Sequence, residues 1–204
     1  MVTPRTILLA TSNPNKVREI REVMHDLPVA WKTLADLPPV PEPVEDGETF
    51  ESNAVKKALY YAEQSGLWTL ADDSGLEVDA LGGAPGVHSA RFAGPGQDST
   101  ANNRKLVAAL AGVPAERRTA RFRCAMAVAA GGRVRAAASG AVEGLIIDEP
   151  RGANGFGYDP HFWIPAFGMT TAEMEPARKN AISHRGRALR TIRPMLEALL
   201  DDAT

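Results

Sequence analysis

The chain contains 204 residues, 44% hydrophobic and 24% charged, a composition that fits one globular domain or two closely joined lobes. Its 23 basic and 25 acidic side chains give a formal net charge of -2, which excludes a global positive field for a nucleic-acid polymer. The single cysteine, Cys124, excludes an internal disulfide and a cysteine-based metal site. The sequence contains no long apolar run of the kind that indicates a signal peptide or a membrane span, so we expect a cytoplasmic protein.

The N-terminal region predicts a strand, a polar turn and a helix. Residues 6–11 form an apolar run, residues 12–15 are turn formers, and apolar residues then recur at helical spacing from Val17 to Leu27. We expect the helix to begin near Asn15 or Lys16 and to direct its positive end at an anion such as phosphate. The turn lacks the Gly-rich Walker pattern, so a plain solvated turn is the alternative.

An irregular, acidic segment is predicted between residues 37 and 47. It contains four prolines and three carboxylates, and we expect it to lie on the surface beside the site. A helix should follow, with Thr49 as its N-cap and Gly66 as its end. Its apolar stripe includes Phe50, Ala54 and Ala58, and Lys56 and Lys57 are predicted to lie in water.

Two adjacent carboxylates, Asp72 and Asp73, follow the predicted buried strand 67–71. We expect them to point to opposite sides, one toward a site and one into the loop, before Gly75 turns the chain. Residues 76–80 would then form a short second strand. Carboxylates suit Mg²⁺, which prefers oxygen ligands. The alternative is that the pair merely caps a turn.

The remaining elements predict an α/β protein with a mixed sheet. A helix capped by Asp98, Ser99 or Thr100 should run through Leu110. A hairpin that turns at Gly131-Gly132 into a strand over 134–138 should follow, and then a further strand over 141–147. Cys124 alternates with apolar residues, so we expect it to fill the core. Residues 152–160 form a Gly-rich aromatic loop, which suits stacking on a planar base but is also ordinary loop chemistry. Pro194 should kink or restart the final helix.

Six short motifs occur in order along the chain. They are 11–16 (TSNPNK), 49–50 with 53–54 (TF, NA), 71–76 (ADDSGL), 82–86 with 89–91 (GGAPG, SAR), 155–160 (GFGYDP) and 183–186 (SHRG). Together they resemble the Ham1/RdgB family of non-canonical purine nucleoside triphosphate pyrophosphatases. The resemblance extends from about residue 6 to about residue 200, and six motifs in register are far more specific than any one alone.

The resemblance implies an elongated two-lobed α/β fold around a central mixed β-sheet, with the active site in the cleft between the lobes. Residues 1–204 would form a single Ham1-like domain with no separable linker. The resemblance also implies a homodimeric, Mg²⁺-dependent hydrolase that converts ITP, dITP or XTP to the monophosphate and pyrophosphate, which would clear deaminated purines from the nucleotide pool. The partner would be this small nucleotide, with no nucleic-acid polymer and no membrane.

The family's functional residues can be transferred by motif. Asp73 would be the catalytic acid–base residue and a ligand of Mg²⁺, and Glu45 would be the second ligand, with the adjacent Asp46 as the alternative. The resemblance assigns a larger set to the substrate, the first six to the triphosphate and the last seven to the nucleoside: Thr11, Ser12, Asn13, Pro14, Asn15, Lys16, Ser74, Phe156, Gly157, Tyr158, Asp159, Lys179, His184 and Arg185.

These assignments define an expected chemistry. Hydrolysis between the α- and β-phosphorus atoms needs water, a base and cations. An aspartate with an ordinary pKa of ~3.9 is a weak base at neutral pH, so the metal would share the activation of water. Donors from Lys179, His184 or Arg185 would favour a 6-oxo purine over adenine. The rival predictions are a Maf-like pyrophosphatase for other modified nucleotides and a nucleotide-binding sensor without turnover.

Overall fold

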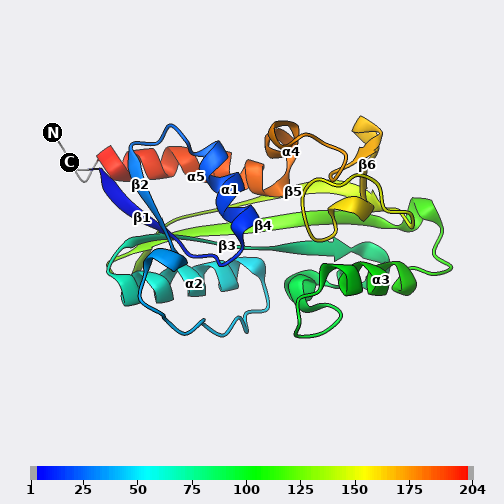
Figure 1. Cartoon of the computed structure of the whole chain (residues 1–204), viewed down its shortest axis with the longest axis horizontal. Helices are drawn as coiled ribbons and strands as arrows, with labels where there is room; N and C mark the ends of the chain where they lie inside the picture. The colour runs from blue at the N-terminus through cyan, green and yellow to red at the C-terminus, as the bar shows by residue number, and fades with distance from the viewer. Residues whose placement is uncertain (1–3, 202–204) are drawn as a thin grey trace. The chain divides into compact units, whose positions relative to one another are not determined.

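The computed structural model describes residues 4–201, which form a seven-stranded sheet and five α-helices (Figure 1). The strand order is β2-β1-β3-β4-β5-β6-β7. The strands are β1 (Arg5–Leu9), β2 (Val29–Thr33), β3 (Trp68–Val78), β4 (Thr119–Ala130), β5 (Arg133–Ile146), β6 (Phe162–Ile164) and β7 (Met169–Thr170). The helices are α1 (Pro14–Val23), α2 (Phe50–Ser65), α3 (Ser99–Ala109), α4 (Pro176–Ile182) and α5 (His184–Asp201). β1 pairs in parallel with β2 and β3, whereas β6 is antiparallel to β5 and β7, so the sheet is mixed.

The described chain divides into two compact units. Unit 1 comprises residues 4–73, 124–140 and 185–201, and unit 2 comprises residues 74–123 and 141–184. β3, β4 and β5 each contribute residues to both units. The assignment of residues 1–204 to a single domain stays a prediction.

The core of unit 1 forms where α1 and α5 cover one face of its strands. Ile7 and Leu9 of β1 belong to this core, because alternate side chains of a strand point to the same face. They belong to one cluster with Ile20 and Met24 of α1 and with Leu189, Ile192 and Leu196 of α5. α2 lies on the opposite face of these strands (Figure 1). Its N-cap is Thr49, whose hydroxyl accepts the Ser52 N–H at 3.1 Å, and Gly66 ends it in a left-handed conformation, as predicted.

The core of unit 2 is formed by a second cluster of buried residues. Leu76 and Val78 of β3 belong to one cluster with Leu106 and Leu110 of α3. Two phenylalanine rings join this cluster from β4 and β6, Phe122 and Phe162, with their centroids 4.5 Å apart. Asp98 caps α3 by accepting the N–H groups of Thr100 and Ala101. The helix predicted to begin at residues 98–100 is therefore confirmed.

Two element predictions were wrong. β3 is one continuous strand of 11 residues, so Asp72-Asp73-Ser74-Gly75 lies within a strand and the chain does not turn there. β5 likewise continues through the two strands predicted at 134–138 and 141–147. In both strands, pairing within the sheet outweighs the local turn signal from glycine. Pro194 lies inside α5, so the helix does not restart there, and the kink that was its alternative stays a prediction.

Other predictions hold. Residues 131–132 form the turn between β4 and β5, and Cys124 is buried in the unit 1 core with an exposure of 1%. The short strands β2, β6 and β7 and the helix α4 were not predicted. Among residues 4–201, no helix is both long enough and apolar enough to cross a membrane.

Candidate active site

The turn between β1 and α1 is fixed by its own side chains. Asn13 is the N-cap of α1, and its side-chain oxygen accepts the N–H groups of Asn15 and Lys16 at 2.9 and 3.4 Å. Thr11 Oγ1 accepts the N–H of Asn13 at 3.2 Å. The helix begins at Pro14, one or two residues earlier than predicted. Because Asn13 already satisfies two N–H groups at the helix start, the charge available to an anion here comes chiefly from Lys16.

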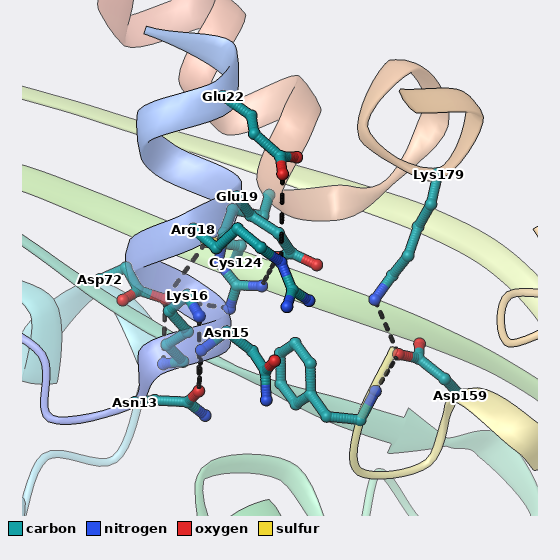
Figure 2. A network of polar contacts seen from close by, with 12 residues as sticks. Asn13, Asn15, Lys16, Arg18, Glu19, Glu22, Asp72, Cys124, Asp159 and Lys179 are labelled. Carbon is teal, nitrogen blue, oxygen red and sulfur yellow. Dashed lines mark hydrogen bonds and ion pairs between the residues drawn. The ribbon is translucent and has the colours of Figure 1, made fainter. Parts of the chain in front are cut away.

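Lys16 belongs to a network of ion pairs inside unit 1 (Figure 2). Its Nζ atom lies 3.0 Å from Oδ2 of Asp72. The same Asp72 oxygen lies 3.1 Å from Nη2 of Arg185, whose Nη1 atom contacts Glu19 at 2.6 Å. Two cations and two carboxylates thus alternate beneath the turn, which explains how a lysine is tolerated at a helix N-terminus.

Charge compensation outweighs burial at Asp72. Burial alone would raise the pKa of this carboxyl group, but the charges of Lys16 and Arg185 hold the pKa well below its usual value. Asp72 is therefore an anion at neutral pH and anchors both cations. Asp72 is thus the carboxylate of the pair that braces the structure, although it braces Lys16 and Arg185 from within β3 and not the predicted loop.

The Arg185 guanidinium is already committed to carboxylates. Its side chain is 2% exposed and contacts Glu19 and Asp72, both in unit 1. The pKa of Arg185 is raised, because these charges outweigh the effect of burial. Its predicted role in reading the base stays a prediction, while its observed contacts with Glu19 and Asp72 give it a structural role in unit 1.

Asp73 projects from the other face of β3 and has different neighbours. Asn53 Nδ2 of α2 donates to its Oδ2 atom at 3.0 Å, and Lys57 Nζ lies 3.7 Å from its Oδ1 atom. The opposite orientation of Asp72 and Asp73 follows from the strand geometry, as predicted. Burial raises the pKa of Asp73 above its ordinary value, and the positive charges of Lys57 and Lys16 oppose this effect. A raised pKa makes Asp73 a better proton acceptor than an exposed aspartate.

Lys57 connects the two predicted metal ligands. Its Nζ atom lies 2.9 Å from Oε1 of Glu45 and 3.7 Å from Oδ1 of Asp73. The lysine is buried, so the prediction that it lies in water was wrong. Its pKa is nevertheless raised, because the charges of Asp73, Asp72 and Glu45 outweigh the effect of burial. Asp46 instead pairs with the exposed Lys56 at 2.5 Å, so the geometry favours Glu45 over Asp46 as the partner of Asp73.

Asn53 and Lys57 were both missed as site residues, although the sequence carries a signal for them. Residues 50, 53, 54, 57, 58 and 61 recur at the three- and four-residue spacing of one helix face, and all six are buried. Asn53 and Lys57 therefore occupy inward-facing positions between apolar residues. A polar side chain at such a position needs a buried partner, and Asp73 is that partner.

A close backbone approach places Glu45 near α2. The Gly47 N–H donates to Asn53 Oδ1 at 2.8 Å, and Asn53 Nδ2 also lies 3.4 Å from the Gly47 carbonyl oxygen. A Cβ atom at residue 47 would come within 2.6 Å of Asn53 Oδ1 and would collide with Ser52 Oγ. Only glycine allows this contact. The acidic segment 37–47 is irregular, as predicted, and is fastened to α2 at this point.

Unit 2 contains the predicted aromatic loop. Asp159 accepts the Phe156 N–H at 2.8 Å through Oδ2, the atom that Lys179 Nζ approaches at 2.7 Å. Thr171 donates to the other Asp159 oxygen at 2.8 Å. Lys179 also lies 4.9 Å from the centre of the Phe156 ring. Figure 2 shows Asp159 and Lys179 directed at each other. Asp159 thus fixes both the loop and the lysine.

The two aromatic residues of the loop differ. Tyr158 is buried in the unit 2 core and donates its hydroxyl to the Ser89 carbonyl oxygen at 2.7 Å, whereas Phe156 is only half-buried. Phe156 is therefore the better candidate for stacking on a base. Gly155 must be glycine, because its φ is +77° and a Cβ atom there would collide with Asp159.

The remaining predicted contacts lie elsewhere in the chain. His184 begins α5, and its ring stacks on Phe122 with the centroids 4.9 Å apart and the planes 18° from parallel. Ser74 lies half-buried in β3, and Ser12 is exposed in the turn before α1. Within unit 1, Lys16 belongs to one ion-pair network with Asp72, whereas Glu45 and Asp73 share another through Lys57. Within unit 2, the structure brings Phe156, Asp159 and Lys179 together.

Comparisons with known proteins find chains that are similar to this one over almost its whole length. A dITP/XTP pyrophosphatase from Desulforamulus reducens is 50% identical over 194 residues, covering 95% of this chain and 96% of that protein. A HAM1 protein structure from Coxiella burnetii superposes with a TM-score of 0.87 at 41% identity, covering 95% of this chain and 99% of the other. A Mycobacterium abscessus structure, described as a nucleoside-triphosphatase and dITP/XTP pyrophosphatase, has a TM-score of 0.75 at 43% identity, covering 94% and 99%.

These likenesses extend over almost the whole chain and confirm the predicted α/β fold with its mixed sheet. The model of the Ham1 family matches residues 7–195. The match includes all six sequence motifs and both carboxylates of the Asp72-Asp73 pair. This chain belongs to the Ham1 family.

Proposed function

We propose that this protein hydrolyses the deaminated purine nucleotides dITP, XTP and ITP to the nucleoside monophosphate and pyrophosphate. The observation that carries the proposal is that Glu45 and Asp73 both contact the buried Lys57. Asp73 lies in β3 beside Asp72, which contacts Lys16. A proton acceptor and the cations that polyphosphate chemistry requires are thus fixed in unit 1. The name dITP/XTP pyrophosphatase, borne by relatives about half identical to this chain, supports the same substrate class.

In the proposed reaction, Asp73 accepts the proton of the attacking water. Burial raises its pKa toward the range where a carboxylate is an effective base, and Lys57 keeps enough of it ionised to act. Asn53 orients the carboxylate by donating to Oδ2. Lys16 then offsets the negative charge that develops on the departing pyrophosphate. Asp72 and Arg185 position Lys16 and do not contact the reacting atoms in this mechanism.

Glu45 and Asp73 also fit a divalent cation. Both carboxylates already converge on one positive charge, the Lys57 ammonium group. No group of three or more histidine, cysteine or acidic residues suited to a metal occurs among residues 4–201. Mg²⁺ is commonly held by one or two carboxylates together with water and substrate phosphates, so a two-carboxylate site is sufficient. When bound, Mg²⁺ would neutralise phosphate charge and lower the pKa of water.

Recognition of the base is assigned to unit 2. Phe156 would stack on the purine, and Lys179 and His184 would supply donors to the 6-oxo group that hypoxanthine and xanthine carry. Adenine presents an amino donor at this position, and a donor facing a donor leaves two polar groups unpaired, at a cost of about 1–3 kcal/mol each. The homodimer implied by the resemblance remains part of the proposal and can be checked by sedimentation velocity.

A panel of nucleoside triphosphates tests the proposed function. The purified protein should release pyrophosphate from dITP, XTP and ITP in the presence of Mg²⁺, with much slower release from ATP and little activity after chelation. Orthophosphate as the first product would show that the bond between the α- and β-phosphates is not the one cleaved. Preference for a modified pyrimidine would favour Maf-like chemistry, and tight binding without product would favour a sensor.

Lys57→Met is expected to move the acid limb of the pH–rate profile to higher pH. Lys57 lowers the pKa of Asp73, so removing its charge should raise that pKa further. Because Asp73 acts as a base only when deprotonated, kcat/KM should then begin to fall at a less acidic pH than in the wild type. The profile of kcat/KM for dITP between pH 5 and 9, at saturating Mg²⁺, measures this shift.

Lys56→Met is the matched control, because Lys56 is adjacent on α2 but pairs with the exposed Asp46. Its profile should coincide with that of the wild type. An unshifted acid limb in Lys57→Met would show that Asp73 is not the titrating base.

A further inference from the structure

The turn that carries Phe156 is held by a side chain from α3. Asn103 Nδ2 donates to the carbonyl oxygen of Gly157 at 3.0 Å, across 54 positions of sequence. The turn also has contacts of its own motif, from the Phe156 N–H to Asp159 and from the Tyr158 hydroxyl to the Ser89 carbonyl oxygen. Asn103 therefore fixes the middle peptide of a turn whose two flanking residues are fixed separately.

The amide of Asn103 makes this contact at a cost. Its Oδ1 atom is shielded from solvent and has no hydrogen-bond partner within residues 4–201. A buried carbonyl oxygen without a partner disfavours the folded state, and an apolar side chain of similar shape would avoid that penalty. The stability of α3 therefore does not account for an asparagine at this position. The hydrogen bond to Gly157 is the interaction that only the amide donor supplies.

The position of this bond links it to the aromatic ring. Gly157 has a φ of +62°, a left-handed conformation that glycine adopts readily and that leaves the direction of its carbonyl group to be fixed by a partner. Phe156 precedes it and is the half-buried aromatic of the loop, with its ring 4.9 Å from Lys179 Nζ. Rotation of the Gly157 carbonyl group would change the backbone that presents this ring.

We propose that Asn103 is a positioning residue for base recognition, which holds the Gly157 carbonyl group so that the Phe156 ring is preorganised to stack on the purine. This inference rests on the proposed function, because it assigns the base to Phe156. Asn103 has no role in binding the phosphates, which the proposed function assigns to Lys16 and its neighbours in unit 1. Loss of the Asn103 donor should therefore weaken binding of the base and spare binding of the pyrophosphate.

The test compares ligands that contain the base with one that lacks it. In Asn103→Leu, the Kd for inosine monophosphate and the KM for dITP should rise about fivefold to tenfold, the factor that corresponds to the loss of one hydrogen bond. Inhibition by pyrophosphate should be unchanged, and kcat should stay within about twofold. The thermal midpoint should stay close to that of the wild type, because removal of the unpaired Oδ1 atom offsets the loss of the hydrogen bond to Gly157. Calorimetry with inosine monophosphate, inhibition by pyrophosphate and steady-state kinetics measure these quantities.

Two further variants make the result decisive. Arg104→Ala changes the exposed neighbour on α3 and should match the wild type in every assay. Asn103→Asp keeps the side-chain shape but places an acceptor against the Gly157 carbonyl oxygen, so its loss of inosine monophosphate affinity should equal or exceed that of Asn103→Leu. Unchanged affinity in both Asn103 variants, or a parallel loss of pyrophosphate inhibition, would overturn the proposal. Failure of the wild type to bind inosine monophosphate would instead reject the proposed function.

Discussion

Asp73→Asn is expected to lower kcat for dITP by about 10²–10⁴-fold, the usual contribution of a positioned general base. The asparagine retains a side-chain oxygen that can accept the Asn53 amide, so the strand and α2 should keep their arrangement. It cannot accept a proton from water at neutral pH. Pyrophosphate release measures the rate, and calorimetry with inosine monophosphate should show affinity close to that of the wild type.

Asp46→Asn provides the comparison for this substitution. Asp46 is an exposed acid that pairs with Lys56, so its amide variant should retain the wild-type rate. Near wild-type turnover in Asp73→Asn would remove Asp73 from the mechanism and would require another base. A loss of rate accompanied by an equal loss of inosine monophosphate affinity would point to a disrupted fold.

Arg185→Leu is expected to lower the free energy of unfolding by about 3–5 kcal/mol, the range found when one partner of a buried ion pair is removed. The substitution deletes the cation that contacts both Glu19 and Asp72, and of the ion pairs that Asp72 forms within residues 4–201 it leaves only the one with Lys16. Urea denaturation at neutral pH, followed by circular dichroism, measures the difference. The loss of stability would by itself lower the amount of folded enzyme, so base selectivity should be compared only under conditions in which the variant is folded.

The same variant has an expected pH dependence. In the wild type, the pKa of Asp72 is depressed, so its contribution to stability is present above the unfolded-state pKa of ~3.9 and is lost as the pH falls through the lower folded-state pKa. Removing Arg185 weakens that depression. The difference in unfolding free energy between wild type and Arg185→Leu should therefore narrow as the pH falls from the folded-state pKa of Asp72 in the variant toward the lower folded-state pKa in the wild type.

Arg193→Leu is the control, because Arg193 forms comparable contacts with Asp26 and Glu197 in solvent. Exposed ion pairs contribute little to stability, so its denaturation midpoint should lie close to that of the wild type. Equal midpoints for all three proteins would show that the buried network does not stabilise the fold.

The local order of elements was predictable where sequence periodicity and capping agree. β1, the polar turn and α1 follow from an apolar run, a cluster of turn formers and a helical repeat, and the N-caps of α2 and α3 follow from Thr49 and Asp98. The continuity of β3 was not predictable, because Asp-Asp-Ser-Gly is common in turns and only pairing within the sheet keeps it extended. The two-residue β7 was missed, because it is too short to show the alternating pattern of a strand.

The candidate site shows the same division. Motifs identified Asp73, Lys16 and the aromatic loop, because their residue types carry the chemistry. They did not reveal that Lys57 joins Glu45 to Asp73, or that Arg185 pairs with Glu19 across more than 160 positions of sequence. Such contacts depend on which face of a helix or strand meets another element. The helical spacing of Asn53 and Lys57 indicated that both side chains face inward. Only the fold showed that their shared partner is Asp73.

Cys124 gives the protein an internal reporter of unfolding. Burial and the nearby Asp72 charge raise the pKa of its thiol to about 12, and it is the sole cysteine of the chain. The reactive thiolate is therefore scarce and inaccessible in the native state, and an alkylating reagent can modify the protein only when this region opens. The rate of thiol labelling in dilute reagent would thus follow the opening of the unit 1 core directly, with no introduced probe.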